Sequence, residues 1–228
     1  MAHPSLTRFG LRRGARGVVL ILHGGQERSA EPVLRRHASW WRMWVLTVAI
    51  RRAAARHDVP VALLRYQVRG WNAAPGREPD PVRDARWALA QLRREHPGAP
   101  VVLIGHSMGG RTANYVADEP DIVGVVALAP WLPPGEPVRL TRLLVLHGTA
   151  DTWTSPQASQ AHVERVRARG AQAAWFPVPG GEHFLAASLS RWHGFARDGA
   201  LGLLGVREPP ADVREALAST GRGQSPVR

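Results

Sequence analysis

The sequence predicts an α/β protein whose mostly parallel, doubly wound sheet has at least six strands and carries helices on both faces. Short apolar runs alternate with helix-patterned segments of about ten or more residues, which is the pattern of βαβ units. A run such as Val101–Ile104 is apolar at every position, as expected of a strand that helices cover on both sides. A chain of 228 residues is also long enough to bury a substantial core in a single domain.

The six expected strands are the short apolar runs. They span Val18–Leu22, Val61–Tyr66, Val101–Ile104, Val123–Leu128, Leu143–Leu146 and Ala173–Val178. The first strand is ended by the pair Gly24-Gly25. Right-handed crossovers between these strands would fix most of the topology.

Five helices are expected between and after the strands, from their apolar spacing. They span Pro32 to about Arg56, Pro81–Glu95, Met108 to about Asp118, Pro156–Arg169 and Leu185 to about Leu204. Proline suits the first turn of the first helix, and Asp80 suits the N-cap of the second. Pro97, Pro120 and Gly170 lie where the second, third and fourth helices are expected to end.

The domain organisation is expected to be simple. Residues 1–207 are predicted to form one domain, and residues 208–228 a loosely ordered tail, because that segment is rich in Pro, Gly, Ser and Arg. The link Pro130–Thr141 between the fourth and fifth strands is too short to hold a cap domain, so any site beneath it should be open.

Composition excludes several classes of chemistry. The chain has no cysteine, which rules out disulfides, thiolate catalysis and Cys-ligated metals. Its net charge is +12 and every basic side chain is arginine, but the arginines are scattered, so we expect compositional bias rather than a specific nucleic-acid site. The spacing of His, Asp and Glu predicts no metal site, and the absence of a P-loop or G-x-G-x-x-G motif predicts no cofactor.

The chain is expected to be soluble and cytoplasmic. The most apolar stretch outside the strands, Met43–Ile50, is far shorter than the roughly 20 residues that a membrane-spanning helix needs. The apolar run near the N-terminus is also too short for a secretory signal.

The strongest chemical motif is Gly105-His106-Ser107-Met108-Gly109. It follows a strand directly and leads into a helix, which is the strand–turn–helix setting of a nucleophile elbow. A turn this tight has no room for bulky flanking side chains, so the two glycines let the backbone pass. Ser107 is then left exposed above the sheet at the N-terminus of the new helix.

A serine hydroxyl needs a general base, and the base needs an acid that orients it. Asp151 lies in the loop after the fifth strand, and His183 lies in the loop after the sixth. Both loops leave the carboxyl ends of their strands, where Ser107 also emerges and where open α/β sheets bind ligands. His193 is an alternative base, although it falls within a helical segment, and Asp118 and Asp121 are alternative acids at the far end of the third helix.

The chain resembles the α/β-hydrolase superfamily, in particular its small lidless serine esterases, thioesterases and dienelactone hydrolases. The motifs that carry the resemblance are HGG at 23–25, GHSMGG at 105–110, HGTADTWTSP at 147–156 and GGEHF at 180–184. The order Ser, Asp, His is also that of this fold. One departure is that dienelactone hydrolases proper carry a cysteine nucleophile, where this chain has Ser107.

The resemblance also implies an oxyanion hole. In this fold one donor is the backbone N–H of the residue after the nucleophile, here Met108. The other comes from the loop after an early strand, and Gly25 is favoured over Gln26. His23 and His147 each precede a glycine at the end of a strand, where they are expected to brace a loop.

The substrate pocket is predicted from positions at the carboxyl ends of strands. Gln26, Trp71, Trp131 and Trp153 all follow strands on that side and are candidates for the pocket lining. Trp40, Trp41 and Trp44 gather on the first helix, where core packing is the simpler interpretation.

These features predict a serine hydrolase that cleaves a small-molecule ester or thioester through an acyl-enzyme on Ser107. An acyltransferase or a peptidase would use the same three residues, and a non-catalytic hydrolase-fold binding protein is a further alternative. The substrate and the oligomeric state do not follow from the sequence.

Overall fold

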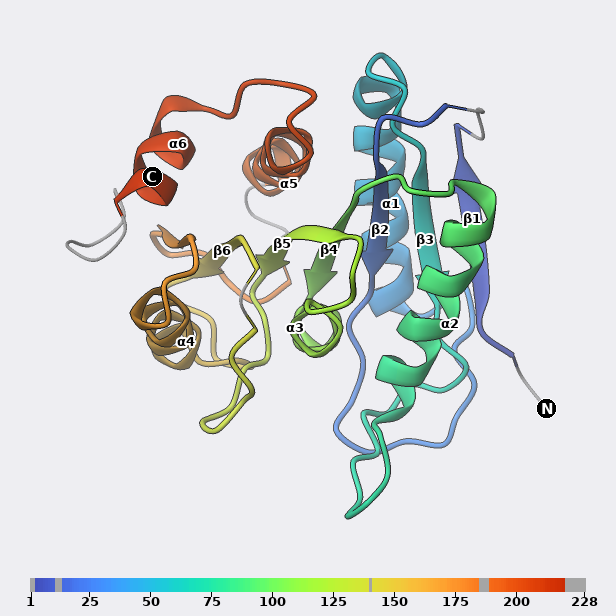
Figure 1. Cartoon of the computed structure of the whole chain (residues 1–228). Coiled ribbons are helices and arrows are strands. Elements are labelled where there is room, and N and C mark those ends of the chain that lie inside the picture. The colour runs from blue at the N-terminus through green and yellow to red at the C-terminus, as the bar shows by residue number, and fades with distance from the viewer. Residues whose placement is uncertain (1–2, 11–13, 140, 185–188, 220–228) are drawn as a thin grey trace.

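The computed structural model describes residues 3–10, 14–139, 141–184 and 189–219, and it contains one sheet flanked by helices (Figure 1). Seven strands form the sheet in the order β1-β3-β2-β4-β5-β6-β7. They are β1 (Ser5–Phe9), β2 (Val18–Leu22), β3 (Val61–Arg65), β4 (Val101–His106), β5 (Ile122–Leu128), β6 (Leu143–Gly148) and β7 (Ala173–Val178). Every neighbouring pair is parallel except β1 and β3. The predicted α/β class is confirmed.

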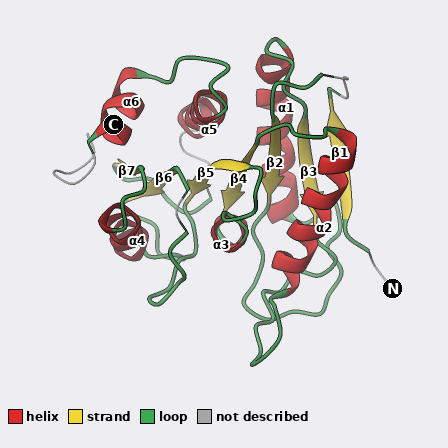
Figure 2. Ribbon diagram, in the orientation of Figure 1, coloured by secondary structure: helices red, strands yellow, loops and turns green. Residues whose placement is uncertain are grey.

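Helices cover both faces of this sheet. They are α1 (Ala38–Ala55), α2 (Asp80–Glu95), α3 (Met108–Tyr115), α4 (Pro156–Ala168), α5 (Leu189–Leu203) and α6 (Ala211–Ala218). Helices α1 and α5 pack on one face, α2, α3 and α4 pack on the other, and α6 lies beside the β7 edge (Figures 1 and 2). The strands between them are almost wholly apolar and buried, so the core fills both sides of the sheet.

The six predicted strands and the central helices are present, but two elements differ at the N-terminal side. Strand β1 was not predicted, because it is a half-buried edge strand without a continuous apolar run. Helix α1 begins at Ala38 rather than at Pro32. Pro32 instead pairs with Val68 in an isolated bridge, and the amide of Val33 donates to the carbonyl of Gln67. This long-range pairing overrides the helical spacing of the sequence.

The predicted loose tail from residue 208 requires a correction. Residues 211–218 form helix α6, whose Val213 and Ala216 are buried, and whose first turn carries Asp212. Two apolar residues three positions apart were enough to anchor a helix against the β7 edge. Residues 220–228 lie outside the described part of the chain, and so do residues 185–188, where the fifth predicted helix was expected to begin.

The parallel order brings the carboxyl ends of the strands to one edge of the sheet. His106 at the end of β4 pairs in register with Leu128 on β5, and Gly148 at the end of β6 pairs with Val178 on β7. The link between β5 and β6 holds no helix or strand among its described residues, so this part of the link forms no cap domain. In the described chain, no helix combines the length and apolar character needed to cross a bilayer.

Candidate active site

Ser107 occupies a sharp turn between β4 and α3. Its backbone has φ 55° and ψ −119°, a conformation that is costly for a residue with a Cβ and that concentrates at functional sites. A Cβ on Gly105 would overlap the carbonyl of Gly109, and a Cβ on Gly109 would overlap the carbonyl of Leu22. The glycines are therefore required by close backbone contacts, as the motif predicted.

Asp151 is fixed by the turn that follows β6. Its Oδ1 accepts hydrogen bonds from the amides of Trp153 (2.8 Å) and Thr154 (2.9 Å), which is how an aspartate closes a tight turn on its own chain. The side chain is fully shielded from solvent. Its other oxygen, Oδ2, is left to face the loop after β7.

The loop that carries His183 is joined to the Asp151 loop by backbone contacts. The amide of Ala150 donates to the carbonyl of Gly181 at 3.0 Å, and the amide of Gly180 donates to the hydroxyl of Thr149 at 2.9 Å. A Cβ on Gly148 would overlap the carbonyl of Gly181, so only glycine lets the two loops approach this closely. These contacts bring His183 against the acid.

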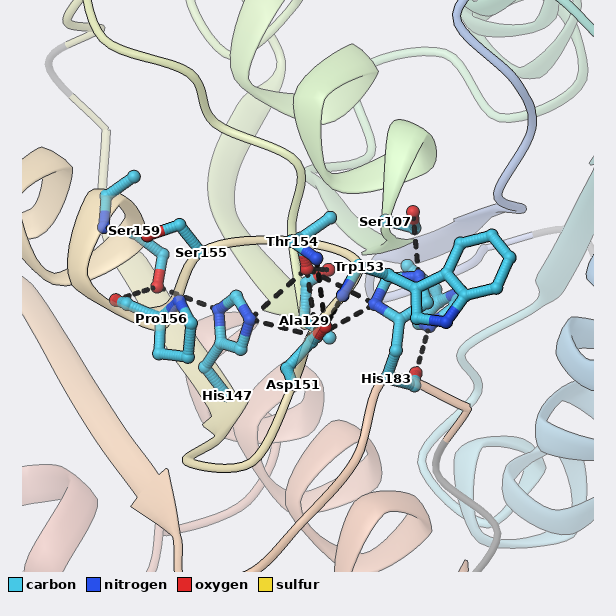
Figure 3. A network of polar contacts seen from close by, with 12 residues as sticks. Ser107, Ala129, His147, Asp151, Trp153, Thr154, Ser155, Pro156, Ser159 and His183 are labelled. Atoms are coloured by element: carbon cyan, nitrogen blue, oxygen red, sulfur yellow. Dashed lines mark hydrogen bonds and ion pairs between the residues drawn. The ribbon is translucent and has the colours of Figure 1, made fainter.

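The three predicted side chains form a continuous series of contacts from Ser107 through His183 to Asp151 (Figure 3). His183 Nε2 lies 3.1 Å from the hydroxyl oxygen of Ser107, and His183 Nδ1 lies 2.8 Å from Oδ2 of Asp151. A carboxylate oxygen only accepts, so Nδ1 carries the proton on that side. Nε2 is then free to accept the proton of Ser107, as a general base must.

The electrostatics of the site favour a charged acid. Burial alone would raise the pKa of Asp151, but hydrogen bonds from His147, His183 and the amide of Thr154 lower it well below its usual range. Asp151 is therefore ionised at neutral pH. Burial lowers the pKa of His106 far below its ordinary value, so His106 stays neutral and its Nε2 donates to the carbonyl of His183 at 3.0 Å.

The rival candidates lie elsewhere. Asp118 pairs with Arg139, and Asp121 pairs with Arg93, both away from the imidazole of His183. His193 lies on α5 and lines no part of the cavity at Ser107.

His23 is bound within the loop after β2. Its Nδ1 donates to the carbonyl of Gly24 at 2.6 Å, and its Nε2 accepts from the amide of Tyr66. Burial lowers the pKa of His23 to about 4, so it is neutral at pH 7 and braces this loop.

Gly25 and Met108 lie against one another in the lining of the cavity that contains Ser107. A Cβ on Gly25 would overlap the Met108 side chain and the carbonyl of Arg69. The amide of Met108 begins helix α3, where the first N–H groups have no acceptor within the helix. The amide of Gln26, in contrast, already donates to the carbonyl of Arg69 at 2.8 Å. Gly25 is thus better placed than Gln26 to offer a free donor.

A cavity of about 430 Å³ opens over Ser107. Its lining consists of Gly24, Gly25, Gln26, Glu27, His106, Ser107, Met108, Trp131, Trp153, Thr154, His183 and Phe184. The sequence-predicted positions Gln26, Trp131 and Trp153 are among them.

The expectation for Trp71 requires a correction. It is 2% exposed and packs behind Trp131, with its ring edge-on to that ring at 6.2 Å. The guanidinium of Arg111 lies 4.3 Å from the centroid of each of these two rings, between them and the Glu136 carboxylate that it pairs with. Trp71 supports the wall of the cavity from behind, because the Arg111 cluster draws it into the core.

Three residues of the site were missed from the sequence. Thr154 donates its hydroxyl to Oδ2 of Asp151 at 2.9 Å, Phe184 lines the cavity beside His183, and His147 lies 3.1 Å from the same Oδ2. Phe184 and Thr154 belong to the GGEHF and DTWT segments and so carried a signal by adjacency. His147 begins the motif at 147–156, but the motif did not show its contact with Asp151, because that contact depends on where β6 places the side chain.

A model of the Alpha/beta hydrolase family matches residues 18–226. The chain belongs to this family. The α/β-hydrolase fold that the sequence motifs implied is thereby confirmed, and the protein is a hydrolase. No curated protein matches the chain.

Solved α/β hydrolases share the same fold at low identity. A lidless α/β serine hydrolase from Xanthomonas campestris is 16% identical, with 86% of this chain and 87% of that chain covered and a TM-score of 0.64. A thermophilic esterase from Thermogutta terrifontis is 18% identical, with coverages of 91% and 92% and the same TM-score. A serine hydrolase homologue from Coxiella burnetii is 15% identical, with coverages of 86% and 90% and a TM-score of 0.63.

Proposed function

We propose that this α/β hydrolase is a serine hydrolase that cleaves small-molecule carboxylic esters or thioesters through an acyl-enzyme on Ser107. The observation that carries the proposal is the line of contacts from the Ser107 hydroxyl through His183 to Asp151. An ionised acid, an imidazole with its proton on the acid's side and a hydroxyl at its other nitrogen are the parts that acyl transfer requires.

In the acylation step, the oxygen of Ser107 attacks the acyl carbonyl while Nε2 of His183 takes the hydroxyl proton. A tetrahedral intermediate forms, and its collapse breaks the bond to the leaving group, which leaves with the proton from Nε2. Water then attacks the acyl carbon while Nε2 of His183 takes a proton from it. The second tetrahedral intermediate collapses, the bond between the acyl carbon and the Ser107 oxygen breaks, and the Ser107 oxygen takes the proton from Nε2 as the acid product leaves. Asp151 holds the imidazole in its tautomer and stabilises the imidazolium that forms in each step.

The amides of Gly25 and Met108 would hold the negative oxygen of each tetrahedral intermediate. Preorganised N–H donors in such a hole contribute roughly 3–4 kcal/mol each to lowering the barrier. Both residues line the cavity with Ser107, which supports this role, and so does the use of the Gln26 amide in a bond to the carbonyl of Arg69.

Labelling with a fluorophosphonate tests the proposed nucleophile. The folded protein is expected to form one covalent adduct, which peptide mass spectrometry places on Ser107, because only an activated hydroxyl attacks the phosphorus at a useful rate. Heat-unfolded protein is the control and should not react. An adduct on another serine, or none on the folded protein, would contradict the assignment.

The proposed substrate class is supported by the aromatic rim of the cavity, which consists of Trp153 and Phe184. Trp153 is 70% exposed, its ring is stacked near His183 at 6.1 Å and 16°, and it meets Phe184 edge-on at 5.0 Å. The leaving group must reach Nε2 of His183 to receive its proton, so this rim borders the leaving-group side. Similar solved structures include an esterase from Thermogutta terrifontis with butyrate bound and Est1E from Butyrivibrio proteoclasticus with ferulic acid bound, which supports small acyl groups.

Replacing Trp153 with alanine should discriminate between leaving groups. We expect kcat/KM for benzyl acetate to fall by about three- to tenfold, the worth of one aromatic contact, while that for cyclohexylmethyl acetate falls less. The two esters share an acyl group and differ mainly in the aromaticity of the alcohol. Trp41→Ala is the matched control, because Trp41 is an exposed tryptophan on α1 outside the cavity lining. Equal losses for both esters would argue against an aromatic subsite.

A further inference from the structure

A second histidine contacts the acid of the site. His147, at the end of β6, is fully buried, and its Nε2 lies 3.1 Å from Oδ2 of Asp151 (Figure 3). This is the same oxygen that His183 Nδ1 approaches at 2.8 Å and that the Thr154 hydroxyl approaches at 2.9 Å. One carboxylate oxygen therefore faces two imidazoles from opposite sides.

The far side of the His147 ring is also bound. Its Nδ1 lies 2.8 Å from the hydroxyl oxygen of Ser159 on α4. That hydroxyl accepts from the indole N–H of Trp175 on β7 at 2.9 Å and reaches the carbonyl of Pro156 at 2.8 Å. Three elements thus fix the ring, and its Nε2 has no freedom to turn away from the acid.

The acceptor-only character of the carboxylate determines the proton on this ring. A bare Nε2 would set its lone pair against the charge of Oδ2, so Nε2 must carry a proton. The Ser159 hydroxyl then either gives its proton to Nδ1, or gives it to Pro156 and accepts one from Nδ1. In both arrangements Nε2–H donates to Asp151. They differ in whether Nδ1 carries a proton and in whether the Ser159 hydroxyl points at Nδ1 or at the carbonyl of Pro156.

We propose that His147 is a positioning residue that donates Nε2–H to the Asp151 oxygen holding His183, and so weakens the pull of that oxygen on the His183 proton. This inference rests on the proposed function. The hydrogen bonds from His147 and His183 both lower the pKa of Asp151 against the opposing effect of burial. His147 thus helps to stabilise the negative charge of Asp151, and this charge in turn stabilises the imidazolium of His183.

The effect should appear in the pH profile of kcat/KM, whose acid limb reports protonation of the base in the free enzyme. Without the His147 donor, Oδ2 attracts the His183 proton more strongly. His183 is then protonated at higher pH, and the acid limb moves upward.

Other groups face these imidazoles and remain the same in every variant. They are His106 on β4, which stays neutral, Glu27 in the cavity wall, and Arg42 on α1, which donates to the carbonyl of Phe184. On the far side of the ring, helix α4 contributes the uncharged hydroxyl of Ser159, which in turn accepts from Trp175 on β7. A difference in the position of the acid limb between parent and variant therefore reports the effect of His147 alone.

Two substitutions at His147 form the test. His147→Leu removes the donor, and we expect the acid limb to move to higher pH by about one unit with a three- to tenfold loss of kcat/KM at neutral pH. His147→Gln is the matched control, because its Nε2 lies as many bonds from Cα as that of histidine and still donates. Its acid limb should stay at the parent position. An unmoved limb in folded His147→Leu, a downward move, or equal shifts in both variants would overturn the proposal.

A measurement on the parent protein keeps the test independent of variant stability. Nitrogen NMR of the enzyme labelled with ¹⁵N-histidine should show Nε2 of His147 protonated at neutral pH and perturbed in Asp151→Asn. An unprotonated Nε2 would overturn the proposal. This spectrum needs no turnover, so it decides the role of His147 even if the parent cleaves no ester or thioester, which would count against the proposed function alone.

Discussion

Replacing Ser107 with alanine is expected to lower kcat for ester hydrolysis by about 10⁴- to 10⁶-fold, the scale seen when a serine hydrolase loses its nucleophile. Alanine has no oxygen to attack the carbonyl, so no acyl-enzyme forms and only the oxyanion donors remain. Steady-state rates with a p-nitrophenyl ester, followed at high enzyme concentration, measure the loss.

The Ser107→Ala protein should remain folded. Serine and alanine both carry a Cβ, so the strained backbone at φ 55° is no worse in the variant, and one hydrogen bond to His183 is lost. We expect its melting temperature to stay within about 2–4 °C of the parent, the shift that about 1 kcal/mol gives in a domain of about 150–250 residues. A folded variant that kept more than about one per cent of the parent kcat would show that another group is the nucleophile.

Asp151→Asn should lower kcat by about 10⁴-fold, because it imposes the wrong histidine tautomer. The amides of Trp153 and Thr154 both point at Oδ1, so the asparagine carbonyl must take that position. Its NH₂ group then faces Nδ1 of His183, which must give up its proton to accept. Nε2 becomes protonated and can no longer take the proton of Ser107.

Asp118→Asn is the matched control for this change. Asp118 is the rival acid of the sequence, and it pairs with Arg139 at the surface, so the same substitution there should leave kcat within about twofold of the parent. The reverse result, with loss of activity in Asp118→Asn and retention in Asp151→Asn, would show that Asp151 is not the acid of the site and would refute the proposed triad.

Much of the fold followed from local patterns. Apolar strands alternate with helix-patterned segments, and strands that are apolar at every position must be covered on both faces; these two patterns predicted the parallel sheet and its helices. The start of α1 could not be predicted this way, because Pro32 has a helix-compatible position in the sequence but pairs with Val68 far along the chain. Helix α6 was missed because its apolar content is low, and its stability depends on the β7 edge against which it packs.

The sequence by itself determined the chemistry of the three meeting side chains. Ser107 required flanking glycines, and His183 and Asp151 followed strands whose ends must share one edge of a parallel sheet, so their approach was implied by chain order. Only the tertiary structure decided that His147 shares the acid and that the Gln26 amide is already bound. It also decided that Trp71 lies behind the cavity rather than in it. Those outcomes depend on which way a side chain or an amide points once loops pack together, and a linear pattern does not encode that direction.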